Sequence, residues 1–241
     1  MKFGIFIYPD VEPIDLATFG VLSMARRIRP EIELCTIAPR AGEVKLANGL
    51  RVIADCDLAS APQLDVLVVT GGPGWQAESR RPETLDFLRQ RAADTLVVSV
   101  CTGGMILAAS GLLDGKAATT KNEVVPPETS PLAMLKAGYP LIDVRAASLV
   151  DENTIITGGG VALCIDAMLH VIARLFGAES AAETARIIEY SRAWDANREQ
   201  FPAYVASTAR CLPQFTPRAA ARPAARPEKI QPPRKVPSSE R

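Results

Sequence analysis

The sequence predicts an α/β fold in which a mostly parallel central sheet is covered by helices on both faces. Three observations carry this prediction. Short, nearly continuous apolar runs rich in β-branched residues are typical of strands buried on both faces. These runs alternate with segments whose apolar residues recur at helical spacing. The chain of 241 residues has room for one large domain with a substantial core.

Five apolar runs bounded by turn residues are expected to form the strands of this sheet. In chain order they are residues 2–7, 32–38, 64–70, 95–100 and 154–159. A smaller strand pair is expected within residues 41–54, because Asn48-Gly49 lies between two short extended runs and this dipeptide is a strong hairpin signal.

The helices are expected between and after these strands. Their predicted ranges are residues 14–27, 82–93, 103–110, 161–176 and 180–193. The segment 161–176 gives the clearest pattern, since its apolar residues form one broad face and Gly177 follows as a stop signal. Its single histidine, His170, is interpreted as a packed or interface side chain rather than a catalytic group.

Residues 1–205 are expected to form one domain and residues 206–241 a disordered tail rich in Pro, Ala and Arg. Residues 216–241 hold seven basic and two acidic side chains and almost no large apolar ones, so this segment cannot bury enough surface to fold alone. The whole chain has a formal charge of zero, which leaves the rest with −5. A domain with a net negative charge lacks the basic surface of a nucleic-acid-binding protein. We interpret the basic tail as a solvated appendage.

Several other classes of protein are disfavoured by composition. No run approaches the roughly 20 apolar residues that span a bilayer, and no export signal is evident, so we expect a cytoplasmic protein without a membrane partner. The five cysteines (Cys35, Cys56, Cys101, Cys164 and Cys211) are odd in number, spread out and without a Cys-x-x-Cys pair. This pattern argues against a disulfide framework and a zinc site, and one histidine excludes a multi-histidine metal site.

Cys101 has the sequence context of a reactive thiol. It follows a predicted strand and precedes Thr102, two glycines and an apolar helix, as in a nucleophile elbow. The helix dipole and unpaired N–H groups at such a position favour the thiolate, which predicts a lowered pKa. The alternative is a buried structural cysteine, and that interpretation suffices for Cys35, Cys56 and Cys164.

Two further strand ends are expected to lie on the same sheet edge as Cys101. Gly71 and Gly72, in the turn "TGGPG", allow close approach of a ligand and offer backbone N–H groups to an oxyanion, although the same residues also suit an ordinary turn. Asp15 follows the first strand. It could be an ordinary charge at a helix start, but Ile14 and Leu16 beside it suggest partial burial, which would raise its pKa.

Four segments together resemble the PfpI superfamily, the class I glutamine-amidotransferase-like group that contains the parkinsonism-associated deglycase. They are "FIYPDVEPIDLATFGVL", "DVLVVTGGPG", "VVSVCTGGMILAASGLLDGKAATT" and "ITGGGVALCIDAMLHVIARLFG". The isocyanide hydratase branch is most similar, together with the ligand domains of related transcription regulators. The resemblance covers about residues 1–190 and implies a flavodoxin-like three-layer sandwich, a homodimer, and no cofactor or metal.

The resemblance also implies roles for single residues. Cys101 matches the family nucleophile, Asp15 the acidic partner in hydratases, Thr102 the hydroxyl beside the nucleophile, and Gly72 a backbone donor of the oxyanion pocket. The proteolytic members have histidine where Thr102 stands, which disfavours a Cys-His protease. Hydratases usually read His-Trp where this chain has Lys121-Asn122, a change expected to alter the pocket wall.

Three functions follow as hypotheses. The first is a cysteine-dependent hydratase that converts an isocyanide-type electrophile to an N-substituted formamide. The second uses the same thiol and carboxyl on glyoxal or methylglyoxal. The third is a redox or small-molecule sensor without turnover. A helix-turn-helix regulator is disfavoured, because the Pro-rich remainder leaves no room for such a domain.

Overall fold

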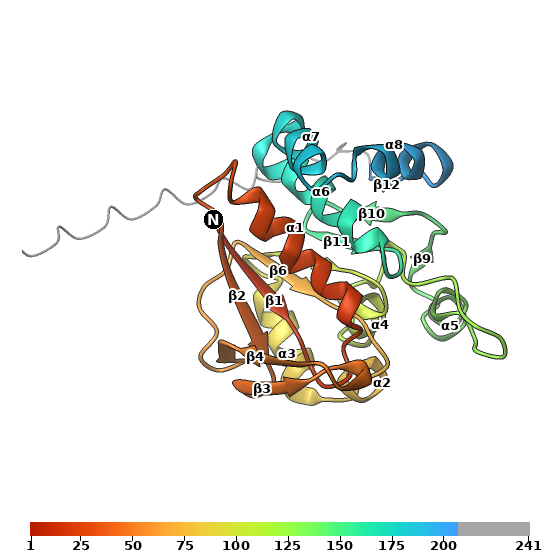
Figure 1. Cartoon of the computed structure of the whole chain (residues 1–241). Helices are drawn as coiled ribbons and strands as arrows, with labels where there is room; N and C mark the ends of the chain where they lie inside the picture. Colours follow the sequence, from red (N-terminus) through yellow and green to blue (C-terminus); the bar gives the residue numbers. More distant parts are fainter. Residues whose placement is uncertain (207–241) are drawn as a thin grey trace, which may run out of the picture. The chain divides into compact units, whose positions relative to one another are not determined.

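The computed structural model describes residues 1–206, and except for Ala206 the predicted tail lies outside the described residues. The described part is built around an eight-stranded sheet with the strand order β12-β10-β11-β7-β6-β1-β2-β5. Helices lie on both faces of this sheet, with α1, α6 and α7 on one side and α3 and α4 on the other (Figure 1). The predicted mostly parallel sheet between helices is therefore confirmed.

The strands of the large sheet are β1 (Lys2–Phe6), β2 (Glu33–Ala38), β5 (Cys56–Asp57), β6 (Val66–Val69), β7 (Leu96–Ser99), β10 (Leu149–Asp151), β11 (Ile155–Gly158) and β12 (Tyr204–Val205). Two small sheets pair β3 (Gly42–Lys45) with β4 (Arg51–Ala54) and β8 (Ala117–Ala118) with β9 (Asp143–Val144). All five predicted strands are present, and β3 and β4 are antiparallel as predicted for the hairpin. In the large sheet, β10 pairs antiparallel with β11, and β12 pairs parallel with β10, so these two edge strands run opposite to the others.

The helices are α1 (Ala17–Ala25), α2 (Trp75–Glu78), α3 (Pro82–Arg91), α4 (Gly103–Ala109), α5 (Pro131–Gly138), α6 (Leu163–Phe176), α7 (Ala178–Ile187) and α8 (Ser191–Gln200). Two 3-10 turns, η1 (Pro13–Leu16) and η2 (Ala47–Gly49), complete the set. The single helix predicted over 180–193 is wrong. Glu189 has a φ of 56°, a left-handed conformation that ends α7, and α8 starts anew at Ser191.

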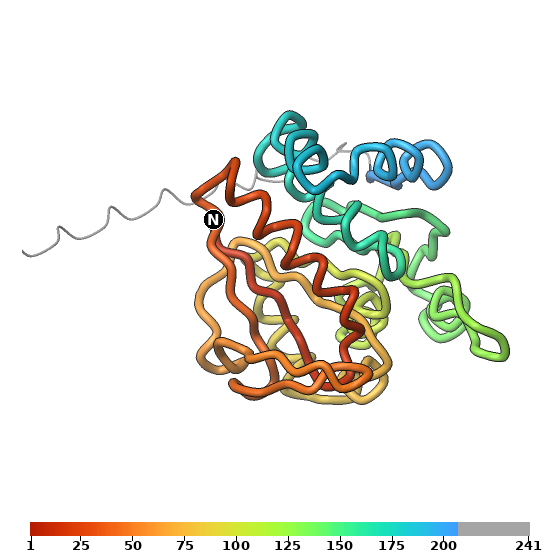
Figure 2. The backbone as a smooth tube through the Cα atoms, in the orientation of Figure 1, coloured from red at the N-terminus to blue at the C-terminus, as the bar shows by residue number. Residues whose placement is uncertain are grey.

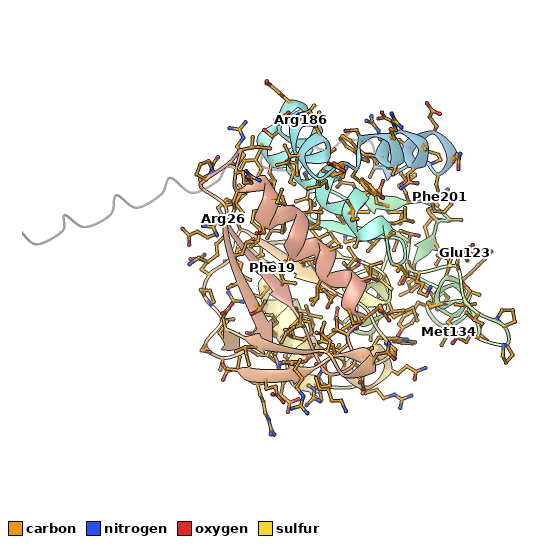
Figure 3. The ribbon with its side chains drawn as sticks, viewed as in Figure 1. Phe19, Arg26, Glu123, Met134, Arg186 and Phe201 are labelled. Atoms are coloured by element: carbon orange, nitrogen blue, oxygen red, sulfur yellow. The ribbon has the colours of Figure 1, made fainter. Side chains whose placement is uncertain are left out.

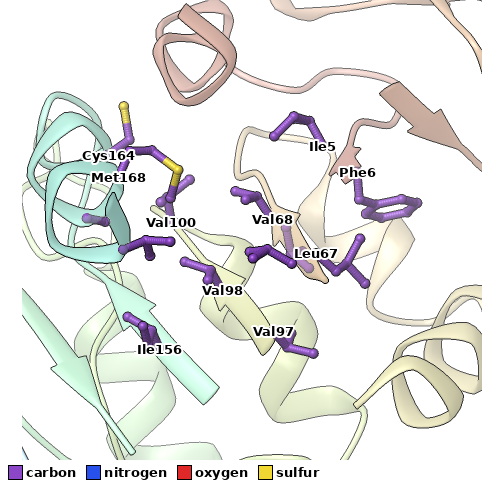
Figure 4. Close-up of a cluster of buried hydrophobic side chains, with 14 of the residues drawn as sticks. Ile5, Phe6, Leu67, Val68, Val97, Val98, Val100, Ile156, Cys164 and Met168 are labelled. Carbon is purple, nitrogen blue, oxygen red and sulfur yellow. The ribbon is translucent and has the colours of Figure 1, made fainter. Parts of the chain in front are cut away.

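The core lies on both faces of the central strands. Every residue of β6 and β7 is buried, which explains why these segments read as continuous apolar runs. Side chains from β1, β6, β7 and β11 meet those of α6 in one cluster (Figure 4). No helix among residues 1–206 is both long enough and apolar enough to cross a membrane.

The sheet brings three strand ends together at one edge. β1 and β7 both pair with β6 in parallel register, so the segments that follow these strands emerge on the same side. The chain descends along β1, turns at η1 and returns along α1, while the β3–β4 hairpin lies across this edge (Figure 2). Asp15, the glycine turn and Cys101 are therefore neighbours in space.

Candidate active site

Cys101 lies at a sharp turn between β7 and α4. Its φ is 52°, an unfavourable conformation for a residue with a side chain, and it is only 2% exposed. Two hydrogen bonds hold this backbone: Cys101 N donates to the Gly159 carbonyl at 2.9 Å, and Thr120 Oγ1 donates to the Cys101 carbonyl at 2.7 Å. The strained corner has the geometry of a nucleophile elbow.

Two glycines make room for this corner. A Cβ on Gly103 would lie 2.3 Å from the Val69 carbonyl oxygen, and one on Gly71 would lie 2.4 Å from Thr102 N. Both distances are shorter than any real contact, so larger residues would displace the elbow. Gly71 thus serves the site by packing behind Cys101 and Thr102.

Asp15 belongs to the turn η1 and is fully buried. Its Oδ2 accepts a hydrogen bond of 2.7 Å from Gly71 N, whereas its Oδ1 has no partner with hydrogen-bond geometry. Burial raises the pKa of Asp15 to about 7, against the lowering effect of the Gly71 N–H and of the neighbouring Cys101 thiol. The carboxyl group is therefore poised to gain and lose a proton near neutral pH.

The predicted acidification of Cys101 is wrong for this structure. Burial raises the pKa of the thiol to about 12, and the charge of Asp15 adds to the rise. The backbone N–H groups of Val161 and Thr102, together with Lys121, lower it by less. Desolvation outweighs the helix start here, so the resting thiol holds its proton and needs a base to remove it.

Thr102 and Gly72 lie beside the sulfur. Gly72 N, a predicted oxyanion donor, donates to Thr102 Oγ1 at 2.8 Å, and this hydroxyl lies 3.3 Å from the Gly72 carbonyl oxygen. The donors close to Sγ are instead the N–H groups of Val161 and Thr102. Val161 has a φ of 52°, and no sequence signal pointed to its role.

A cavity of about 730 Å³ opens at this edge of the sheet. Its lining residues come from five segments, and they are Glu12, Gly72, Pro73, Trp75, Gln76, Cys101, Thr102, Lys121, Val124, Glu128, Thr129, Pro131, Met134 and Val161. Of the residues predicted to line the pocket, Lys121 does so. Gly71 and Asn122 do not: Gly71 is buried behind the elbow, and the exposed Asn122 donates to Glu123 Oε1 at 3.0 Å.

Several residues that line the cavity at Cys101 were not predicted from the sequence. Trp75 belongs to the one-turn helix α2 and Met134 to α5, neither of which was predicted. Met134 and Glu123 lie in the part of the chain that projects beside the sheet (Figure 3). Ser130-Pro131 was the available signal for α5, because a serine cap followed by proline is a common helix start.

His170 lies outside the cavity lining. Its Nε2 is 2.8 Å from Asp151 Oδ2, which fits the predicted packed histidine. Among residues 1–206, no group of three or more His, Cys, Asp or Glu side chains is arranged to hold a metal ion.

Comparison with known proteins agrees with this geometry. Residues 1–174 match the model of the DJ-1/PfpI family. The chain belongs to this family. It is 30% identical over 198 residues to the isonitrile hydratase of Pseudomonas putida, with 80% of each protein covered. It is also 31% identical to the HTH-type transcriptional regulator GbdR of Pseudomonas aeruginosa, where the match covers 65% of this chain and 41% of the regulator.

Solved structures of the DJ-1/PfpI family share the fold. A ThiJ/PfpI family protein from Pseudomonas syringae superposes with a TM-score of 0.68 at 27% identity, covering 78% of this chain and 74% of the other. DJ-1beta of Drosophila melanogaster gives 0.66 at 20% identity, covering 78% of this chain and 97% of the other. The predicted flavodoxin-like sandwich and family membership are confirmed.

Proposed function

We propose that this protein is a cysteine-dependent hydratase that adds water to an isocyanide-type electrophile and releases an N-substituted formamide. The observation that carries the proposal is the proximity of the Cys101 thiol to the fully buried carboxyl group of Asp15, whose pKa is raised to about 7. Such a group can serve as base and acid in successive steps at neutral pH. The similarity to isonitrile hydratase supports this choice of reaction.

The reaction begins when the Asp15 carboxylate takes the thiol proton of Cys101. The sulfur then attacks the terminal isocyanide carbon, and Asp15 returns the proton to that carbon, which gives a covalent thioimidate. During attack, the N–H groups of Val161 and Thr102 stabilise the thiolate that forms.

Water completes the cycle. Asp15 takes a proton from water as the water oxygen adds to the thioimidate carbon, and then passes this proton to the nitrogen. The C–S bond then breaks, the new hydroxyl loses its proton to the leaving sulfur by way of Asp15, and the formamide departs. The sum is one isocyanide plus one water giving one formamide, with the thiol regenerated.

Cavity size bears on the choice of substrate. A volume of about 730 Å³, with Trp75, Val124 and Met134 in its wall, accommodates a molecule with a bulky apolar substituent. Glyoxal or methylglyoxal would fill only a small part of it. We therefore rank the 2-oxoaldehyde reaction second, although it needs the same two groups.

Similarity to transcription regulators supports one other function. A ligand sensor without turnover would use the same cavity, and a protonated, buried Cys101 suits a wall residue as well as a nucleophile. Turnover assays with cyclohexyl isocyanide and methylglyoxal, with Cys101→Ala as control, distinguish the three functions. Formamide release that Cys101→Ala abolishes supports the hydratase, while saturable binding without product in either assay supports the sensor.

The homodimer and the cytoplasmic location expected from the sequence stay predictions. Light scattering after size-exclusion chromatography checks the first. Cell fractionation checks the second.

A further inference from the structure

A second cavity, of about 360 Å³, lies at the same sheet edge between the ends of β1 and β2. Three basic side chains line it, and each comes from a different segment: Arg40 follows β2, Lys45 ends β3 and Arg81 precedes α3. None of them lines the cavity of Cys101. This cavity therefore needs its own explanation.

Two of the three cations that line this cavity have no anionic partner among the described residues. Glu43 is its one acidic lining residue, and its Oε1 already binds Arg51 at 2.7 Å. Within residues 1–206, neither the Arg40 guanidinium nor the Lys45 ammonium has an ion-pair or hydrogen-bond partner. Arg81 uses Nε to bind Glu78 Oε2 at 3.2 Å, which leaves its terminal nitrogens for another anion.

The frame around these cations is fixed by the fold. Asp10 N donates to the Lys45 carbonyl at 3.0 Å, so the hairpin is tied to the segment after β1. Val44 and Ala38 between the cations are buried. Helix α3 begins at Pro82 without a side-chain cap, and its positive N-terminal end adds to the field beside Arg81. The backbone that carries the three exposed cations is therefore held in place before a ligand binds.

We propose that this cavity binds a small-molecule phosphomonoester. Two guanidinium groups and one ammonium group match the oxygens of a phosphate dianion, since arginine offers paired donors and lysine a point charge. The volume exceeds what inorganic phosphate occupies, which leaves space for an organic substituent against Pro9, Ala38 and Pro39.

Calorimetric titration of the full chain with inorganic phosphate, ribose 5-phosphate and citrate, at constant ionic strength, tests the proposal. The decisive variant is Arg40→Gln with Lys45→Gln, because both side chains are exposed and have no partner within residues 1–206, so we expect the fold to stay intact. Arg26→Gln with Arg27→Gln is the matched control, because it also removes two exposed cations. Arg26 lies at the end of α1, away from the hairpin (Figure 3).

We expect saturable binding of ribose 5-phosphate to the wild type and to Arg26→Gln with Arg27→Gln, and a Kd at least about tenfold higher in Arg40→Gln with Lys45→Gln. Inorganic phosphate should bind the same site more weakly. Absence of saturable binding, equal affinity of Arg40→Gln with Lys45→Gln, or binding of citrate alone would each overturn the proposal. Thermal unfolding of each variant verifies that a lost signal does not reflect lost structure.

Discussion

Two buried aspartates of this protein have opposite surroundings. Asp15 is 0% exposed and Asp151 is 5% exposed, so burial does not separate them. The oxygens of Asp151 are occupied by His170 Nε2 at 2.8 Å, Arg174 Nη1 at 2.9 Å and Asn153 N at 2.8 Å. Asp15 has one backbone donor and one oxygen without a partner.

The difference in partners sets the difference in proton affinity. For Asp151, burial would raise the pKa, but the hydrogen bond from His170 and the charge of Arg174 bring it below its usual value. For Asp15 nothing offsets burial sufficiently, and the pKa rises to about 7. A buried carboxylate whose oxygens both have hydrogen-bond partners stabilises the fold. A buried carboxyl group that lacks such partners is available for proton transfer. Asp15 is of this second kind, and it lies beside the Cys101 thiol.

Asp15→Asn should produce the largest loss of activity. The amide keeps the size and can still accept from Gly71 N, but it cannot carry a proton, so we expect turnover to fall about 10²- to 10⁴-fold. The measurement is steady-state formamide release from an isocyanide. Retained far-ultraviolet dichroism shows that the fold is intact. Turnover within about twofold of wild type would refute the acid-base role of Asp15.

Asp151→Asn should instead cost stability and spare activity. It leaves Arg174 and His170, which are 28% and 25% exposed, without a carboxylate partner. We expect a loss of about 2 kcal/mol, or about 4–8 °C in Tm for a domain of this size. Thermal unfolding and the same turnover assay give both values. A large drop in kcat at unchanged Tm would show that our separation of the two aspartates is wrong.

The sequence predicted the framework of the site better than its electrostatics. Strand ends on one edge of a parallel sheet converge by topology, so Asp15, Gly72 and Cys101 could be grouped from local patterns alone. The pKa of Cys101 could not be predicted from the sequence, because it depends on how completely α6, η1 and the glycine turn exclude water from the thiol. Trp75 and Met134 were missed because one- and two-turn helices have too few residues to show a periodicity.

The two aspartates should also give stability opposite dependences on pH. The folded state holds the Asp15 proton up to about pH 7, whereas an unfolded chain loses it near 3.8. The contribution of Asp15 to the free energy of unfolding is therefore complete below about pH 4 and is lost as pH rises through 7. Its size is at most about 4 kcal/mol. The lowered pKa of Asp151 acts in reverse, so its contribution is present above about pH 4 and is lost in more acidic solution.

Urea unfolding between pH 4 and 8 checks these signs. The free energy of unfolding of the wild type should decline between pH 5 and 8, and Asp15→Asn should flatten this decline. The variant should also be more stable than wild type at pH 8, because the neutral amide is never forced to ionise. Asp151→Asn should keep that decline. A wild-type stability that rises from pH 5 to 8 with no difference in Asp15→Asn would contradict the raised pKa of Asp15.

Asp15→Glu should have the smallest effect on turnover. It separates the need for a transferable proton from the need for an exact position of the carboxyl group. Glutamate retains an ionisable carboxyl group, but its extra methylene must fit a fully buried site where Oδ2 now lies 2.7 Å from Gly71 N. We expect kcat to fall about tenfold, less than in Asp15→Asn, because the acid is present but held in a poorer geometry. The pH profile of kcat should keep a titration that Asp15→Asn lacks. If Asp15→Glu were as inactive as Asp15→Asn and showed no such titration, the exact place of the carboxyl, rather than its proton, would be what the site requires.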